Sequence, residues 1–317
     1  MAQAFVELLK LLGSEDQPLV TSRLAEFSDL DIARLEQFCA AWASFSADRR
    51  HSILKQLGQM ADSQIELSFE AINRMALDDP DPRSRAQAIA NLWESEDPRL
   101  ARPLLVLLEA DPEIGVRVAA ARALGLFVLL GETEDLSAEL LLDIEEGLLR
   151  AVREDKSPEV RDGCLQSLGF SSREEVPALI EQAYSSSLES TLRSALQAMA
   201  RSANSRWEPQ VMAKLYDPGP DIRLEAVQAA GELGLRQAAP DLVDLLDDVD
   251  DRVRRAAIWS LGQVGGPLAS EALAKLQDSV TGEEVELVQD ALDNLAFEDG
   301  ARDNFTFDLD DAEDPAD

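Results

Sequence analysis

Residues 248–261 have the sequence DVDDRVRRAAIWSL, and this pattern recurs along the chain. It aligns without a gap to residues 79–92 (DPDPRSRAQAIANL), 111–124 (DPEIGVRVAAARAL) and 155–168 (DKSPEVRDGCLQSL). Each copy starts with Asp, has Arg at its seventh position and ends on Leu. Residues 217–230 keep the register with Ala230 in the closing place, and weaker copies end at Leu57, Met199 and Leu292. The last four intervals between closing residues are all 31, which indicates helical repeats that stack on their neighbours.

Each copy has the local chemistry of a helix. Its Asp, Ser and Pro residues suit an N-cap and a first turn, and apolar residues then recur at helical spacing. Gly125, Gly169, Gly231 and Gly262 follow near the closing place, where we expect the helix to end on a left-handed residue. Leu-rich segments then predict a second helix at residues 98–110, 174–184, 237–248 and 267–279. The longer interval before Leu168 indicates an insertion around residues 131–141.

The sequence therefore predicts an all-α fold, a right-handed α-solenoid of about eight stacked helical hairpins over residues 29–297. Residues 1–28 are predicted to form an N-terminal helical cap or arm, because a terminal repeat would otherwise expose its apolar face. Residues 298–317 carry nine acidic groups and one Arg, with Phe305, Phe307 and Leu309 among them. They are predicted to be a disordered acidic tail that serves either solubility or docking.

The register D-x-D-x-x-V-R-x-A-A-x-x-A-L-G followed by a Leu-rich helix resembles the HEAT repeats, in the short form of phycobilisome-lyase-like and other bacterial HEAT proteins. The resemblance covers roughly residues 30–295 and implies a solenoid. It also implies that the recurring Asp and Arg form a structural ladder between adjacent repeats, not a catalytic site. The expected ladder pairs Asp79, Asp111, Asp155, Asp217 and Asp248 with Arg85, Arg117, Arg161, Arg223 and Arg254. Leu192 and Val285 stand in the Arg place of two weaker copies, so interruptions are expected there.

The charge of the chain restricts its partners. Asp and Glu number 62 against 29 Lys and Arg, a formal net charge of −33. Such a chain repels phosphate groups, so nucleic acid is not expected as a partner. The charge is explained by solubility, by a basic protein partner or by life in high salt. Glu7 and Lys10 interrupt the first apolar stretch, and no membrane-length uncharged run occurs. We expect a cytoplasmic protein without membrane insertion.

Catalytic chemistry is not expected. His51 is the single histidine, which excludes the repeated His-Glu pairs of the di-iron HEAT protein deoxyhypusine hydroxylase. Cys39 and Cys164 lack metal-ligand spacing and are expected to be buried small side chains. No Gly-rich phosphate loop occurs. The sequence thus predicts no metal, no cofactor and no enzymatic activity.

The remaining candidate is the surface of the Arg-bearing helices. Counting from the Arg, positions +1 and +5 should point away from the core and line the concave face of the solenoid. The predicted partner-binding residues there are Arg122, Gln166, Arg193, Gln197, Gln228, Arg255 and Trp259. Arg and Trp are frequent interface hot spots, although Trp259 could instead pack between repeats and the arginines could pair with neighbouring acids. We expect a monomeric interaction scaffold or adaptor for a protein or peptide; the alternative is a bilin lyase or a lyase-like chaperone.

Overall fold

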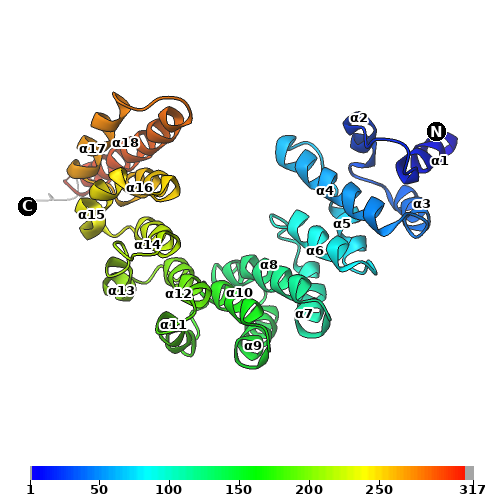
Figure 1. The fold of residues 1–317 in the computed structure, drawn as a ribbon, viewed down its shortest axis with the longest axis horizontal. Coiled ribbons are helices and arrows are strands. Elements are labelled where there is room, and N and C mark those ends of the chain that lie inside the picture. Colours follow the sequence, from blue (N-terminus) through cyan, green and yellow to red (C-terminus); the bar gives the residue numbers. More distant parts are fainter. Residues whose placement is uncertain (1, 311–317) are drawn as a thin grey trace, which may run out of the picture. The chain divides into compact units, whose positions relative to one another are not determined.

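The structure, a computed structural model, describes the backbone of residues 2–310 and the side chains of residues 4–282 and 284–297. Every regular element in these residues is a helix. The chain divides into unit 1, Met1–Ser171, and unit 2, Ser172–Asp317. Helices follow one another as hairpins in both units, so the prediction of an all-α solenoid of HEAT-like hairpins is confirmed (Figure 1).

Unit 1 contains a cap followed by four hairpins. The second helices of successive hairpins, α4, α6, α8 and α10, pack side by side, and α3 packs on α5 as α7 does on α9. The elements are α1 (Ala2–Gly13), α2 (Thr21–Leu24), η1 (Ala25–Phe27), α3 (Ile32–Trp42), α4 (Ala47–Ser63), α5 (Glu70–Ala76), α6 (Pro82–Asn91), η2 (Pro98–Leu100), α7 (Ala101–Ala110), α8 (Ile114–Glu132), α9 (Ala138–Glu154) and α10 (Pro158–Leu168). The insertion expected near residues 131–141 falls at the end of α8, the following turn and the start of α9.

The N-terminal segment is packed against the first hairpin. The ring of Phe27 lies 5.6 Å from that of Phe5 and 5.4 Å from that of Phe38, measured between centroids. The guanidinium of buried Arg49 donates from Nε to the carbonyl oxygen of Leu12 at 2.6 Å, which ties α1 to α4. These contacts cover the apolar face of the first repeat, as a terminal cap must.

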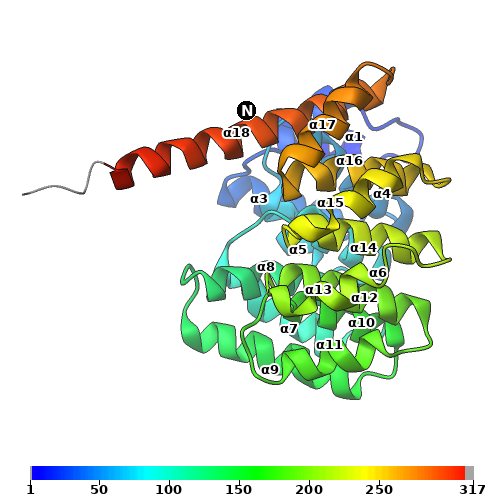
Figure 2. The same cartoon turned by 90° about the vertical axis from the view of Figure 1, so that its left-hand side faces the viewer.

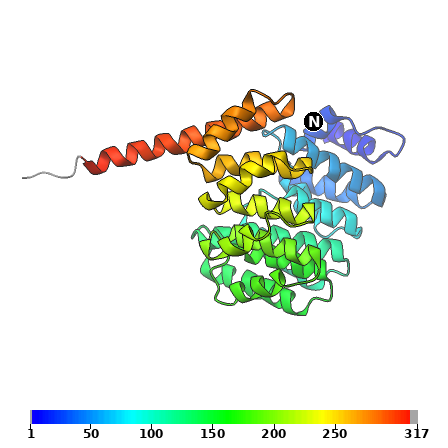
Figure 3. The same ribbon diagram turned by 60° about the vertical axis from the view of Figure 1, so that its left-hand side comes forward.

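Unit 2 repeats the hairpin arrangement, with α12, α14, α16 and α18 packed in sequence. Its elements are α11 (Val176–Tyr184), α12 (Glu189–Arg201), η3 (Ser205–Trp207), α13 (Glu208–Met212), α14 (Pro220–Glu232), η4 (Arg236–Ala238), α15 (Ala239–Asp244), η5 (Leu245–Asp247), α16 (Asp251–Val264), α17 (Pro267–Gln277) and α18 (Glu283–Asp310). Figures 2 and 3 show the C-terminal part of α18 projecting past α16 and α17. The backbone is thus helical over residues 298–310, where a disordered tail was predicted, and residues 311–317 lie outside the described residues.

None of the glycines at the closing places ends a helix on a left-handed residue, so that prediction was wrong. α8 continues past Gly125, α14 past Gly231 and α16 past Gly262. Gly169 caps α10 with a φ of −53°, in the right-handed region. The reason for glycine is space: a Cβ on Gly231 would lie only 2.7 Å from the Oγ of Ser260. Glycine here allows neighbouring helices to approach closely.

The close approach brings a hydroxyl of one helix onto the backbone of the preceding one. Ser260 Oγ on α16 donates to the carbonyl oxygen of Val227 on α14 at 2.8 Å, and Ser260 is fully buried. In unit 1, Ser167 Oγ on α10 donates to the carbonyl oxygen of Ala121 on α8 at the same distance. Both serines occupy the thirteenth position of their repeats. The repeats are thus joined by a recurring buried hydrogen bond that satisfies both polar groups.

One helix in the described part of the chain, α8, is long and apolar enough to cross a membrane by length and composition alone. Core helices can have the same composition. α8 contacts α6, α7, α9 and α10, and Val116, Ala120, Leu124 and Val128 are buried in it. Its apolar character is accounted for by this packing.

Candidate partner-binding surfaces

The first Asp and the Arg of each copy are fixed by hydrogen bonds inside their own repeat. In unit 2, the carboxylate of Asp248 accepts the N–H of Asp250 at 2.8 Å, and Arg254 Nη1 donates to the carbonyl oxygen of Asp248 at 2.9 Å. The same two bonds occur in the other four regular copies, at Asp79 and Arg85, Asp111 and Arg117, Asp155 and Arg161, and Asp217 and Arg223. Within a repeat, therefore, Arg binds the Asp backbone and not its carboxylate.

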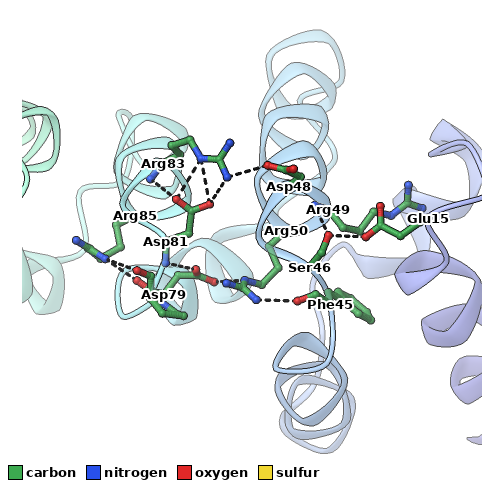
Figure 4. Close-up of polar contacts among 11 residues, drawn as sticks. Glu15, Phe45, Ser46, Asp48, Arg49, Arg50, Asp79, Asp81, Arg83 and Arg85 are labelled. Carbon is green, nitrogen blue, oxygen red and sulfur yellow. Dashed lines mark hydrogen bonds and ion pairs between the residues drawn. The ribbon is translucent and has the colours of Figure 1, made fainter.

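The carboxylate instead pairs with the Arg of the preceding repeat. Arg85 contacts Asp111 with two hydrogen bonds of 2.7 and 2.8 Å. The other pairs are Arg50 with Asp79 at 2.8 Å, Arg117 with Asp155 at 3.0 Å and Arg223 with Asp248 at 2.8 Å. Figure 4 shows Arg50 between Asp79 and the carbonyl oxygen of Phe45. The expected ladder between adjacent repeats is present: Arg85 pairs with Asp111, and Asp79 pairs with Arg50 of the first, weaker copy.

The ladder is interrupted where a residue type is missing. The copies beginning at residues 186 and 279 have Ser in the Asp place. In the described part of the chain Arg161 makes no ion pair, and Arg254 pairs with Asp251 on its own helix at 2.8 Å. Because Leu192 supplies no guanidinium, Asp217 pairs with Lys214 at 3.0 Å. The ladder residues thus bind one another, the backbone or nearby charged side chains within the fold.

Two of the ladder acids, Asp248 and Asp155, have lowered pKa values. The hydrogen bonds from Arg223 lower the pKa of Asp248 below its usual value. Burial is the largest single influence on Asp155 and raises its pKa, but the hydrogen bonds from Arg117 and from the N–H of Ser157, together with the positive charges of Arg117 and Arg161, outweigh it, and the net shift is downward. Both carboxylates therefore carry their charge at neutral pH.

The predicted partner-binding residues do not share one environment. Arg122 on α8 and Arg255 on α16 are exposed, and Gln228 on α14 is half-buried. Gln166 on α10 has only 7% of its surface exposed, which contradicts its assignment to an open face. Its helix is buried over nearly its whole length, including position +1 at Asp162, so the helical pattern counted from Arg fails here.

Two further predicted residues are already engaged. Arg193 Nη2 lies 2.8 Å from Glu225 Oε1, and Gln197 Nε2 donates to Glu225 Oε2 at 2.8 Å. Glu225 on α14 is buried, with 4% exposed. Arg193 on α12 therefore neutralises a buried carboxylate of the next repeat, and Gln197 adds a hydrogen bond to it. The sequence shows an acidic residue two positions after Arg223, namely Glu225, but it does not show that this residue is buried.

Trp259 combines the two roles that the sequence left open. Its Cζ3 would lie 2.7 Å from a Cβ on Gly231, so the ring packs against α14. The side chain nevertheless keeps 37% of its surface exposed. Arg255, one turn earlier on α16, is also exposed. Gln228, Arg255 and Trp259 together form what we call the α14–α16 surface of unit 2.

A second surface, in unit 1, was missed by the sequence analysis. A groove of about 260 Å³ lies between the end of α4, the 64–69 loop, α5 and residues 91–95. It is lined by Ile65, which is 94% exposed, and Trp93, which is 62% exposed. Trp93 stands at the fifteenth position of its repeat, where the other four regular copies have Gly. α6 ends at Asn91, before this position. A large apolar residue in the place of Gly was the sequence signal that could have pointed to this surface.

The two cysteines and the arrangement of metal-binding residue types are further candidate sites. Burial raises the pKa of the Cys164 thiol, and it also raises that of half-buried Cys39. A neutral thiol is a poor nucleophile and metal ligand. Among the described residues, no group of three or more His, Cys, Asp or Glu side chains is arranged to hold a metal ion.

Solved structures of other proteins match this chain. The CpcE–CpcF complex of phycocyanin lyase from Nostoc has a TM-score of 0.53 and 19% identity, covering 89% of this chain and 97% of the other. YibA from Escherichia coli has 0.43 and 17%, covering 79% and 98%. Human deoxyhypusine hydroxylase has 0.33 and 20%, covering 93% and 96%. At 19% identity the likeness to the phycocyanin lyase complex shows the fold alone.

Sequence comparison identifies the family. No curated protein sequence matches the chain. The model of the HEAT repeats matches residues 70–144 and 208–296, together just over half of the chain. These segments contain Arg85 and Asp111, and Arg223 and Asp248, the two ladder pairs with the shortest ion contacts between regular copies. The chain belongs to the family of HEAT-repeat proteins.

Proposed function

We propose that this chain is a non-catalytic scaffold that binds a protein or peptide partner through the α14–α16 surface of unit 2. The observation that carries the proposal is Trp259, which is 37% exposed on a helix whose other large apolar side chains are buried. We propose further that the chain acts as a cytoplasmic monomer without a cofactor. The binding function is supported by the repeat architecture, since stacked helical pairs form extended binding surfaces.

The environment of Trp259 suits a binding anchor. Because its ring packs on Gly231, it is held in place before a partner arrives. A pre-ordered aromatic side chain loses less conformational entropy on binding than a mobile one. Trp and Arg are the residue types that most often dominate interface energies, and Arg255 is exposed one turn away.

The test is affinity capture from a lysate of the source organism. The wild type is compared with the double variant Trp259→Ala, Arg255→Gln and with a matched control, Val249→Ser, Arg236→Gln. Val249 is 94% exposed and Arg236 is exposed, so the control removes the same residue classes from elsewhere on unit 2. Arg193 is left unchanged because its loss would strand buried Glu225.

A protein retained by the wild type and the control, and lost by the double variant, would support the proposal. Circular dichroism must show equal helicity for all three proteins. Retention of the same proteins by all three would contradict binding at this surface. If none of the three proteins captures a specific partner, the result would contradict the scaffold function itself.

The runner-up function is that of a bilin lyase or lyase-like chaperone. The likeness to phycocyanin lyase is one of fold, at 19% identity. Mixing the chain with a bilin and an apo-phycobiliprotein would test it. Formation of a covalently coloured protein would favour the lyase, and an unchanged absorbance spectrum would favour the scaffold.

A further inference from the structure

The groove of unit 1 is a second surface with its own chemistry, independent of the α14–α16 surface. Isolated exposed apolar side chains are common on protein surfaces and need no explanation. Here Ile65 and Trp93, with 94% and 62% of their surfaces exposed, line the same groove. Trp93 replaces the Gly that lets neighbouring helices approach in other copies. In three of the regular copies the Gly lies against the next helix, whereas Trp93 follows the end of α6 and is largely exposed.

The side-chain amide of Asn91, which lines the groove, already makes its hydrogen bonds within the protein. Asn91 Nδ2 donates to the carbonyl oxygen of Leu54 at 2.8 Å and to Asn73 Oδ1 at 2.9 Å, which uses both its hydrogens. Its Oδ1 accepts from Gln87 at 2.8 Å. Because these bonds are internal, an apolar side chain can enter the groove without leaving this amide unpaired.

The charge around the groove is of one sign. Asp62, Glu70 and Glu94 line it, and none of the described lining residues is Lys or Arg. Glu70 is paired with Arg74 at 2.9 Å. Asp62 and Glu94 are exposed and make no ion pair within the part of the chain that the structure describes. An apolar segment that carries positive charge beside it is complementary to this groove.

We propose that the Ile65–Trp93 groove binds a short segment of a partner protein that places a bulky apolar side chain between Lys or Arg residues. A second copy of this chain is a poor occupant, since two molecules of formal charge −33 repel each other. The apolar contact supplies the affinity, and Asp62 and Glu94 select the cationic flanks.

The probe is a phage-displayed library of random 12-residue peptides, selected on the full chain. Enriched peptides are resynthesised with a fluorophore and titrated by anisotropy. The groove variant is Ile65→Ser, Trp93→Ala, and the charge variant is Asp62→Asn, Glu94→Gln. Their matched controls are Ile32→Ser, Val106→Ser, which removes two other exposed apolar residues of unit 1, and Glu139→Gln, Glu146→Gln, which removes two other exposed acids.

We expect enrichment of peptides with an aromatic or Leu residue beside Lys or Arg. The groove variant should weaken their binding by about tenfold or more, as loss of a hot spot does. The charge variant should weaken it about threefold at low salt, with a smaller effect at high salt. Both controls should stay within about twofold of the wild type.

Three results of the peptide experiment, and one of a parallel measurement, would overturn the proposal. One is enrichment of acidic or purely polar peptides, and another is equal binding by the groove variant and its control. The third is enrichment of no peptide at all. Sedimentation of the free chain is measured in parallel, because a dimer that the groove variant abolishes would make a second copy the occupant. A failure here leaves the capture experiment on Trp259 unaffected, since unit 2 is unchanged in these variants.

Discussion

The ladder makes one prediction that separates two arginines at the same repeat position. Arg85 and Arg161 both occupy the seventh position, and both donate to the backbone carbonyl of their own repeat's Asp, at 2.8 and 2.7 Å. Only Arg85 also reaches a carboxylate, that of Asp111. Replacing each with Ala in turn therefore compares the same change with and without a cross-repeat ion pair.

The structure sets the size of the difference. Asp111 and Arg85 have 3% and 11% of their side chains exposed, so Arg85→Ala leaves a buried carboxylate with only the N–H of Glu113, at 2.9 Å. Breaking one side of a buried pair costs about 3–5 kcal/mol. Arg161→Ala removes the hydrogen bond to the carbonyl oxygen of Asp155 and leaves no buried charge unpaired, so it should cost about 1 kcal/mol. For a unit of this size, 3 kcal/mol corresponds to a fall in Tm of about 6–12 °C.

The assay is urea unfolding followed by circular dichroism at 222 nm, with hydrogen exchange to assign the loss to unit 1. Asp111→Ala added to Arg85→Ala should recover part of the stability, because the unpaired charge is then gone. The reasoning would be refuted if Arg161→Ala cost as much as Arg85→Ala, since the carboxylate would then contribute nothing.

Three further predictions concern the packing and titration of the repeats. Gly231→Ala should destabilise unit 2 by about 1–3 kcal/mol through its clash with Ser260, whereas Gly115→Ala, with no atom within 4 Å, should be neutral or slightly stabilising; thermal unfolding distinguishes them. Ser260→Ala should cost about 1 kcal/mol in urea unfolding, because the hydroxyl bond to the α14 backbone is lost, and a cost near zero would contradict that bond. The pKa of Asp248 is lowered in the fold, so its ionised carboxylate stabilises the protein above its unfolded pKa of about 3.9, and this stabilisation is lost as the pH falls below that value. The difference in unfolding free energy between wild type and Asp248→Asn should therefore stay constant from pH 5 to 7 and shrink toward pH 2.

The fold could be predicted because each repeat carries its own signals. Asp248 and Arg254 are the first and seventh residues of one repeat, and together they mark the start of its helix. The interval of 31 residues then gives the position of the neighbouring repeat. The register of the ladder could not be predicted from spacing, because Arg85 lies close to both Asp79 and Asp111 and only the packing of α6 on α8 decides between them.

The candidate site was predicted less well, since exposure depends on what covers each helix. Position +5 is exposed at Arg122 and Trp259 but buried at Gln166. The same helical pattern describes all three, so sequence alone does not distinguish them. Trp93 carried the most specific signal, a large side chain in a Gly position, and it lies outside the pattern that was searched.

The central claim is that a protein partner binds the chain at the α14–α16 surface, and site-specific photocrosslinking tests it most directly. Benzoylphenylalanine is placed at position 259 in one variant and at position 249 in another, and each is irradiated in the lysate. The scaffold account predicts one protein crosslinked from position 259 and not from position 249. Identical products from both positions, or none from position 259, would contradict it.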